Sequence, residues 1–195
     1  MPWGDRASSI QTGHFSGPVG SSSGQFQFQP GLKVVEFIPP FRSFTPKYGY
    51  FEIRLKAAAT AGFHTALWMI GYEGEATGEI RCFELHGASI LNEGSRFDTG
   101  ILPWKDIQLH EECHEDWVAI NATEFHIYGI DWHMDRVDYY VYNNLIRSIK
   151  QSPNYEMQFL LGLYERPKEV ARVLPKPVYP VFCDIDYFRG YRRLG

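Results

Sequence analysis

The sequence has few cysteines and no long apolar run. Its 195 residues include three cysteines, Cys82, Cys113 and Cys183, and their spacing matches no zinc motif, so we expect neither a disulfide framework nor a zinc site. At most one disulfide bond can form. No stretch reaches the roughly 18 apolar residues of a membrane span, and the N-terminal residues hold no run of signal-peptide length. We expect a soluble protein, secreted if a signal was trimmed upstream; its compartment is otherwise open.

Positive charge is not in excess either. The chain has 19 Lys and Arg residues against 23 Asp and Glu residues, a formal net charge of −4. No basic run could follow a phosphate backbone, so a nucleic-acid partner is not expected. The length suits one larger β domain better than two small ones. We therefore expect a single domain over residues 1–195 and a monomer.

Helical periodicity is also missing, because no segment of ten or more residues has the pattern of an amphipathic helix. Short alternating runs take its place, and the clearest is Tyr48–Lys56, in which Phe51, Ile53 and Leu55 share one face. Comparable runs occupy residues 32–38, 65–70, 79–85, 124–132, 136–142, 145–150, 158–164 and 181–191. Asn143-Asn144 predicts a tight hairpin turn, since Asn tolerates positive φ. Many strands without helices indicate an all-β fold, an antiparallel β-sandwich or jelly roll.

Two regions depart from this pattern. Residues 1–30 are rich in Gly, Ser and Gln, which predicts an irregular N-terminal segment that wraps the domain and leads into a short polar strand at residues 25–28. Residues 94–114 are the least regular stretch of the chain, and we interpret them as a long loop.

Aromatic residues make up 16% of the chain, with 12 Tyr, 14 Phe and 5 Trp. Such side chains suit the half-buried surfaces of sheets, and their flat rings also stack on the apolar faces of sugars. The strand pattern sends Trp132 toward the core. Trp104 and Trp117 fall in or beside the irregular region and are candidates for stacking on a sugar, with simple packing as the alternative.

Two carboxylates lie in residues 78–84, GEIRCFE. Glu79 and Glu84 are five residues apart, so strict alternation along a strand would place them on opposite faces. A β-bulge near Cys82-Phe83 would return them to one face, because an extra residue shifts the alternation by one. A retaining glycosidase needs such a pair, a nucleophile and a general acid about 5 to 5.5 Å apart. Without the bulge, two solvated charges on a strand are the simpler interpretation.

Several segments together resemble glycoside hydrolase family 16, the β-jelly-roll family of laminarinases, lichenases and agarases. Tyr48–Lys56 is similar to the strand before the family's catalytic strand, and His64–Gly71 is similar to its tryptophan-bearing strand. Residues 78–84 fall where the family has Glu-x-Asp-x-x-Glu. Residues 124–132, 137–146 and 184–191 resemble later strands of the family, so the resemblance runs in order from about residue 45 to 191.

The resemblance implies a concanavalin A-like jelly roll whose concave sheet forms a sugar-binding cleft. It also implies an endo-acting hydrolase of a β-glucan or galactan, with a polysaccharide or oligosaccharide as partner and no membrane partner. Position by position, Glu79 matches the nucleophile, Glu84 matches the general acid/base, and Trp68 matches a wall of the cleft.

Two further expectations come from the resemblance. His110 lies where the family often supplies a cleft histidine; together with His114 and the acids between them it could also bind a metal, but a sugar-contacting or surface loop is the expected role. No cofactor is required, although the family often holds a structural calcium through an Asp of the closing strand. Asp186 is the candidate for that ligand, with solvated strand charge as the alternative.

Position 81 departs from the family pattern, because Arg81 stands in place of the central Asp. A permanent cation beside two carboxylates favours their ionised forms, which makes Glu84 a poorer acid. Three alternatives stay open. Arg81 turns away and the pair is active, or Arg81 binds a sulfate or uronate of an acidic polysaccharide, or the site only binds carbohydrate. His86, just after Glu84, is expected to be structural.

Overall fold

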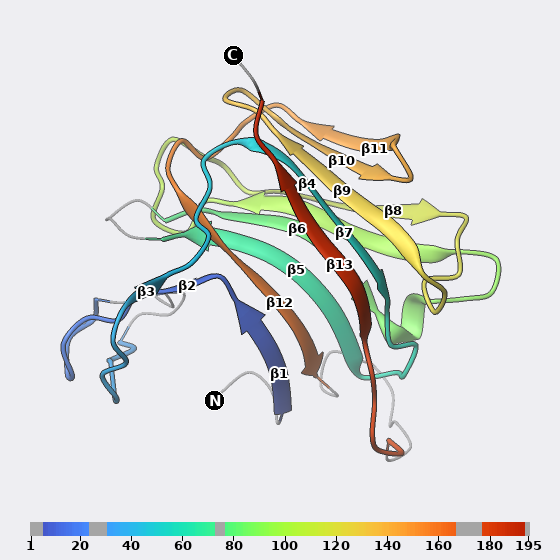
Figure 1. Ribbon diagram of the computed structural model, residues 1–195, viewed down its shortest axis with the longest axis horizontal. Helices are drawn as coiled ribbons and strands as arrows, with labels where there is room; N and C mark the ends of the chain where they lie inside the picture. The colour runs from blue at the N-terminus through green and yellow to red at the C-terminus, as the bar shows by residue number, and fades with distance from the viewer. Residues whose placement is uncertain (1–5, 24–30, 73–76, 167–176, 194–195) are drawn as a thin grey trace.

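The strands form two antiparallel sheets that pack face to face (Figure 1). The computed structural model of the chain describes residues 6–23, 31–72, 77–166 and 177–193. The first sheet has six strands in the order β1 (Arg6–Gln11), β12 (Met157–Glu165), β5 (Phe63–Gly71), β6 (Glu79–His86), β7 (Ser95–Leu102) and β8 (Glu112–Val118). The second has five strands in the order β11 (Asn144–Ile149), β10 (Val137–Val141), β9 (His126–Trp132), β4 (Gly49–Lys56) and β13 (Asp184–Tyr191).

Small elements complete the fold. β2 (Gly13–His14) and β3 (Phe41–Arg42) form a separate two-stranded pair. Within the described ranges the one helix is the 3-10 turn η1 (Gly87–Ser89), and no helix there is long and apolar enough to cross a membrane. The predicted all-β jelly-roll sandwich is confirmed.

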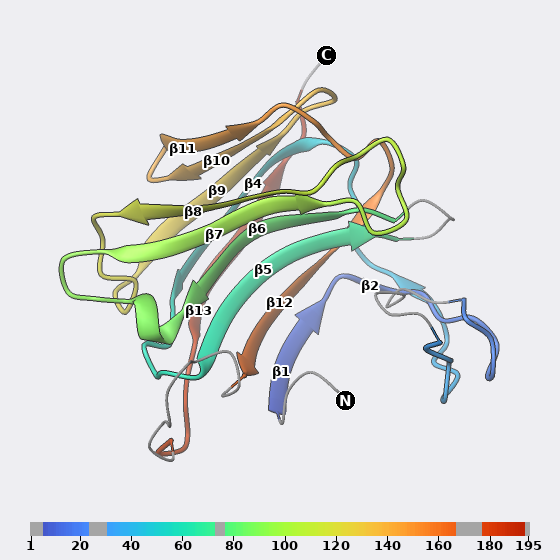
Figure 2. The same cartoon turned by 180° about the vertical axis from the view of Figure 1, so that it is seen from behind.

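The core lies between the two sheets, because each strand sends alternate side chains into it. On β4, Phe51, Ile53 and Leu55 are buried while their neighbours along the strand are only half-buried. Trp132 is completely buried, as its strand pattern predicts, and its Nε1 donates a hydrogen bond to Ser152 Oγ at 2.8 Å. The strands of the six-stranded sheet bow along their length (Figure 2). Their outer face, turned away from the second sheet, carries the polar residues of the candidate site.

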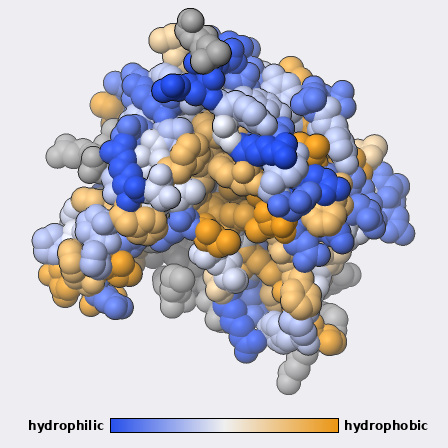
Figure 3. All heavy atoms as spheres, in the orientation of Figure 1, coloured by the Kyte–Doolittle hydropathy of each residue, from blue (hydrophilic) through white to orange (hydrophobic). Residues whose placement is uncertain are grey.

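The prediction that residues 1–30 form an irregular segment was wrong in part. Residues 6–11 form the edge strand β1, paired with β12 from Arg6 opposite Glu165 to Gln11 opposite Leu160. The expected strand at residues 25–28 lies outside the described residues. Residues 32–38 are not a strand, and Val35 is 89% exposed. The two prolines that follow have no N–H to donate to a ladder, and exposed apolar side chains gather in this part of the chain, seen at the lower left of Figure 3.

The long loop expected at residues 94–114 was also wrong, because it contains β7 and the start of β8. On β7, Phe97, Thr99 and Ile101 point into the core, and the polar Thr99 on this face weakens the alternation of apolar and polar residues. β8 is an edge strand made largely of polar residues and lacks an apolar face. The predicted hairpin is confirmed between β10 and β11, although its two positive-φ residues are Tyr142 and Asn143, one position earlier than expected.

Candidate active site

Strand β6 carries one extra residue. Arg81 pairs with Trp68 of β5 and Phe83 pairs with Leu67, so Cys82 has no partner of its own on that strand. The register against β7 shifts at the same place, between Arg81 and Glu84. Cys82 and Phe83 both belong to the core although they are consecutive. This is the β-bulge expected near Cys82-Phe83, and it brings the side chains on either side of it to one face of the sheet.

Glu79 begins β6 on the outer face and is 7% exposed. Its Oε2 accepts a hydrogen bond from the indole Nε1 of Trp104 at 2.9 Å. Burial raises the pKa of Glu79 to about 7, since a charge is costly away from water. The hydrogen bond from Trp104 and the charge of Arg81 act in the opposite direction, whereas the charge of Glu84 adds to the increase. Burial therefore outweighs the opposing contributions of Trp104 and Arg81 at this carboxyl group.

Arg81 and Glu84 form an ion pair. The Nε of Arg81 is 3.4 Å from Oε2 of Glu84, and the two side chains are 21% and 17% exposed. Arg81 thus points toward the carboxylates, and the alternative in which it turns away was wrong. Because a guanidinium is permanently charged, this pair places a fixed cation beside Glu84.

His86 lies on the same face, two residues beyond Glu84, and contacts carboxylates of two strands. Its Nε2 is 3.2 Å from Oδ2 of Asp98 on β7 and 3.9 Å from Oε2 of Glu84. Asp98 also forms an ion pair with Arg96, whose Nε is 3.1 Å from Asp98 Oδ1. The sequence interpretation missed Asp98 and Arg96 because both lie in the stretch taken for a loop. The alternation of Phe97, Thr99 and Ile101 with polar residues was the signal that could have found them.

Glu84, His86 and Asp98 form a group among the described residues whose ligand atoms lie within 4.8 Å of one another. Two guanidinium groups already lie against this group, Arg81 on Glu84 and Arg96 on Asp98. Positive charge at that distance opposes a bound cation, so the residues present do not fit a metal ion.

The structural calcium that the resemblance implies at Asp186 stays a prediction. Asp186 Oδ2 accepts a hydrogen bond from Arg54 Nη1 at 2.5 Å, so its charge is already paired. Calcium takes six to eight oxygen ligands. Within the part of the chain that the structure describes, Asp186 belongs to no group of His, Cys, Asp or Glu side chains arranged for a metal.

Tryptophans lie on both sides of β6. Trp68 of β5 is directly opposite Arg81 in the register, and its Nε1 donates to Tyr164 Oη at 3.1 Å. Trp104, 41% exposed, follows β7 and contacts Glu79. Trp117, 55% exposed, pairs with Arg96 across β7 and β8, and its indole covers Gly94. Arg96 bridges Asp98 and Glu115, so this part of β8 presents its odd-numbered side chains to the outer face.

His110 lies away from the two carboxylates. Its side chain is 73% exposed and its Nε2 is 3.5 Å from Glu112 Oε2. Its backbone N–H donates to Gln151 Oε1 at 3.0 Å. Glu112 and Asp116 are four residues apart on β8, so their side chains point to the same side of the strand. Asp116 accepts a hydrogen bond from Arg147 of the second sheet. His110 therefore contacts the side of β8 that is turned toward the second sheet, and its contact with a sugar stays a prediction.

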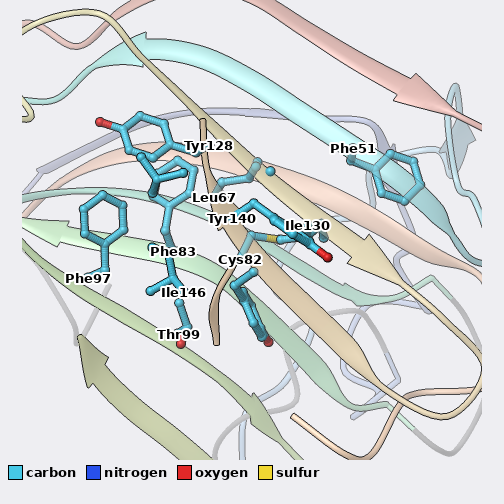
Figure 4. Close-up of a pocket in the computed structure, with 13 residues that line it drawn as sticks. Phe51, Leu67, Cys82, Phe83, Phe97, Thr99, Tyr128, Ile130, Tyr140 and Ile146 are labelled. Atoms are coloured by element: carbon cyan, nitrogen blue, oxygen red, sulfur yellow. The ribbon is translucent and has the colours of Figure 1, made fainter. Parts of the chain in front are cut away.

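A small cavity of about 20 Å³ lies on the other side of β6, between the two sheets (Figure 4). Cys82 and Phe83 line it from the first sheet, and Tyr128 and Ile130 line it from the second. This volume is enough for about one water molecule. It is far too small for a sugar and does not belong to the candidate site.

The family model for glycosyl hydrolases family 16 matches residues 41–173, which include both carboxylates and all three outer-face tryptophans. No curated protein matches the chain by sequence.

Solved structures also resemble the chain. The GlcNAcα1-4Gal-releasing endo-β-galactosidase from Clostridium perfringens is 28% identical with a TM-score of 0.73, covering 95% of this chain and 46% of that one. The β-glucanase of Bacillus licheniformis is 20% identical with a TM-score of 0.63, over 77% and 69% of the two chains. The laminarinase catalytic domain from Thermotoga maritima is 21% identical with a TM-score of 0.62, over 78% and 67%.

These similarities do not all support the same conclusion. The glucanase and the laminarinase support the fold alone, because identity is low. The chain spans about half the length of the Clostridium perfringens enzyme that it matches. The family model covers more than half of the chain and includes the bulged strand β6. The chain belongs to glycosyl hydrolases family 16.

Proposed function

We propose that this protein is a retaining, endo-acting glycoside hydrolase of a β-linked polysaccharide, a β-glucan or a galactan. Glu79 is the nucleophile and Glu84 is the general acid/base. One observation carries the proposal: the β-bulge at Cys82 brings Glu79 and Glu84 to the same face of β6, where their charges interact. Family membership supports glycosidic-bond hydrolysis, and a 28% identical structure is named as an endo-β-galactosidase.

The two carboxyl groups divide the reaction into two steps. Glu79 attacks the anomeric carbon as a carboxylate, and Glu84 gives its proton to the departing glycosidic oxygen. This forms a glycosyl ester on Glu79 and frees one part of the polysaccharide. Glu84, now a carboxylate, takes a proton from water, and the oxygen of that water attacks the anomeric carbon and releases Glu79. Two inversions retain the anomeric configuration.

The neighbouring side chains favour the role of Glu79 as nucleophile more than the role of Glu84 as acid. Trp104 donates to Glu79 Oε2, and Arg81 favours its ionised form, so both partly offset the effect of burial on the nucleophile. Arg81 also lies against Glu84, which must hold a proton to act as an acid. We therefore expect a slow enzyme, because the productive state needs Glu79 ionised and Glu84 protonated together.

The tryptophans support cleavage within a chain. Trp68 lies on β5, on one side of β6, and Trp117 lies on β8, on the other side. Trp117 is exposed and Trp68 is half-buried, and aromatic rings that are open to solvent can bind the apolar faces of sugars. Rings on both sides of the carboxylates suit a polysaccharide that continues past the scissile bond in both directions.

A second candidate function is carbohydrate binding without turnover, and the Arg81–Glu84 ion pair favours it. A glutamate that acts as the ion-pair partner of an arginine is a poor proton donor to a leaving group. The tryptophans would then still hold the sugar.

The test is release of reducing sugar from laminarin, lichenan, xyloglucan, agarose and carrageenan, measured for the parent protein, Glu79→Gln and Glu84→Gln. Glu52→Gln is the matched control, because Glu52 lies on the second sheet. We expect release by the parent and the control, loss of at least about a thousandfold in the two site variants, and retained anomeric configuration by NMR. Release that survives in Glu79→Gln would overturn the nucleophile assignment. No release on any substrate, with binding retained in calorimetry, would establish the second function.

A further inference from the structure

The turn that follows β7 holds Trp104 in a conformation that few side chains adopt. Trp104 has a φ of 44°, in the left-handed region. A residue other than glycine stays there only where its surroundings fix it. The indole of the same Trp104 donates a hydrogen bond to Glu79 Oε2 at 2.9 Å. A contact that fixes this turn therefore also fixes the hydrogen-bond donor of the candidate nucleophile.

Backbone hydrogen bonds close this turn and join it to the segment before β6. The N–H of Asp106 donates to the carbonyl of Pro103 at 2.6 Å, and the N–H of Lys105 donates to the carbonyl of Thr77 at 3.4 Å. Asp106 is 6% exposed, and its Oδ1 accepts a hydrogen bond from the N–H of Gln108 at 2.9 Å. A buried carboxylate needs more than one donor. Asp106 therefore requires a further partner at the base of the turn.

Tyr155, in the loop between β11 and β12, supplies that partner. Its hydroxyl is hydrogen-bonded to the side chain of Asp106. The same hydroxyl accepts a hydrogen bond from the backbone N–H of Gly78 at 2.5 Å, and Gly78 directly precedes Glu79. Because the phenolic O–H donates to the carboxylate, its oxygen can accept the N–H. One hydroxyl thus connects the turn of Trp104 with the residue before Glu79.

Two glycines leave room for the Tyr155 side chain where β5 ends and β6 begins. The N–H of Gly71 donates to the carbonyl of Gly78 at 3.2 Å, so the two positions are paired. A Cβ at position 71 would lie 3.0 Å from Tyr155 Cε2, and a Cβ at position 78 would lie 2.6 Å from Tyr155 Oη. Any side chain at position 78 would therefore displace the hydroxyl. The absence of side chains at both positions allows the backbone and the phenol to approach closely.

We propose that Tyr155 is a positioning residue for the candidate nucleophile Glu79. Through Gly78 it fixes the start of β6, which carries Glu79. Through Asp106 it fixes the turn that carries Trp104, the hydrogen-bond donor to Glu79. The consequence for catalysis rests on the proposed function of Glu79, whereas the placement of Trp104 against Glu79 does not.

The decisive substitution is Tyr155→Phe, which removes the hydroxyl and keeps the ring. Asp106 and the N–H of Gly78 lose this partner, so the turn should relax and the indole of Trp104 should leave Glu79. The measurement is ¹H–¹⁵N NMR of the five tryptophan indoles, with Trp104 assigned through Trp104→Phe. In the parent, the Trp104 N–H signal should shift with a midpoint at about pH 7, where its partner Glu79 ionises. This shift should be absent in Glu79→Gln.

We expect Tyr155→Phe to reduce the pH-dependent shift of the Trp104 signal at least about threefold, because the indole no longer donates to the carboxylate. Tyr142→Phe is the matched control, since the Tyr142 hydroxyl also donates to a backbone carbonyl, that of Phe125, beside the second sheet. The control should leave the signal unchanged. An unchanged pH response in Tyr155→Phe, with or without a lower melting temperature, would overturn the proposal and leave Tyr155 a support of the fold alone.

If Tyr155→Phe does not fold, Asp106→Asn decides. It keeps the volume of the side chain and removes the charge that the phenolic O–H binds, so the pH response of Trp104 should fall in the same direction. A response equal to that of the parent would overturn the proposal.

Kinetics provide a second measurement. We expect Tyr155→Phe to lower kcat about tenfold with little change in KM, and to shift the acidic limb of kcat/KM to higher pH, as expected for Trp104→Phe. The double variant should be no slower than the slower single variant, because both substitutions remove the same contact. Additive losses would overturn the route through Trp104. Absence of hydrolysis in the parent would overturn the proposed function, and the NMR response would still decide whether Tyr155 positions Trp104.

Discussion

Arg81 Nε lies 3.4 Å from Glu84 Oε2, on the outer face of β6 and two residues from Glu79. The guanidinium at this position belongs to the strand that the β-bulge interrupts. The site therefore contains a fixed positive charge between its two candidate catalytic groups.

Replacement of Arg81 should move the acidic limb of the pH profile of activity. Arg81→Gln removes a cation that lowers the pKa of Glu79. Glu79 must lose its proton to act as the nucleophile, so the acidic limb of kcat/KM should shift to higher pH, by about half to one unit. Arg54→Gln on the second sheet is the control. A profile that stays in place would show that Arg81 does not act on the pair.

Loss of the Trp104 hydrogen bond should move one limb only. Trp104→Phe keeps an aromatic ring and removes the donor to Glu79 Oε2, which raises the pKa of Glu79 further above about 7. The acidic limb of kcat/KM, which reports ionisation of the nucleophile, should shift to higher pH while the basic limb stays. A shift of both limbs, or of the basic limb alone, would contradict the assignment of Glu79 as the group that must ionise.

Glu79 should also make the folded protein less stable at alkaline pH. Burial raises its folded-state pKa from 4.5 to about 7, so the stability associated with its protonated form is complete below about pH 4.5 and is lost as the pH rises through 7. The cost above that pH is at most about 3 kcal/mol. Glu79→Gln should therefore raise the melting temperature by several degrees at pH 8 and change it little at pH 4.

Calorimetry at the two pH values checks this expectation. Glu52→Gln, a half-buried glutamate on the second sheet, serves as the comparison and should not show the same pH-dependent gain. An equal gain for Glu79→Gln at pH 4 and pH 8 would mean that ionisation of Glu79 is not its cause.

Replacement of Gly94 should weaken sugar binding by displacing Trp117. A Cβ at position 94 would overlap the indole ring of Trp117, so Gly94→Ala must displace that ring from its place on β8. If Trp117 stacks on the polysaccharide, Gly94→Ala and Trp117→Ala should both raise Kd by about tenfold, measured by calorimetry on a bound oligosaccharide. Leu91→Ala, at an exposed position of the same turn, should not. Unchanged affinity in both variants would remove Trp117 from the sugar site.

Local pattern was enough to predict much of the fold. The alternation in Tyr48–Lys56 predicts β4, and the same rule sends Trp132 to the core, because a strand has a period of two wherever it lies. Glu79 and Glu84 are five residues apart, with apolar Cys82 and Phe83 between them. This spacing was also enough to predict that a β-bulge is needed to bring the two glutamates to the same face of the strand. The bulge that meets this condition is visible in the register of β6 against both neighbours.

Cross-strand neighbours needed the tertiary structure. Asp98 faces Glu84, and Trp117 faces Arg96, only because β6, β7 and β8 pair in one register, and β7 and β8 were not recognised as strands from their residues. The direction of Arg81 and the contacts of His86 depend on the same register. By itself the sequence determined the fold class and the two candidate carboxylates, since these depend on local periodicity and spacing. Only the tertiary structure decided which charges surround them, because those charges come from strands distant in the chain.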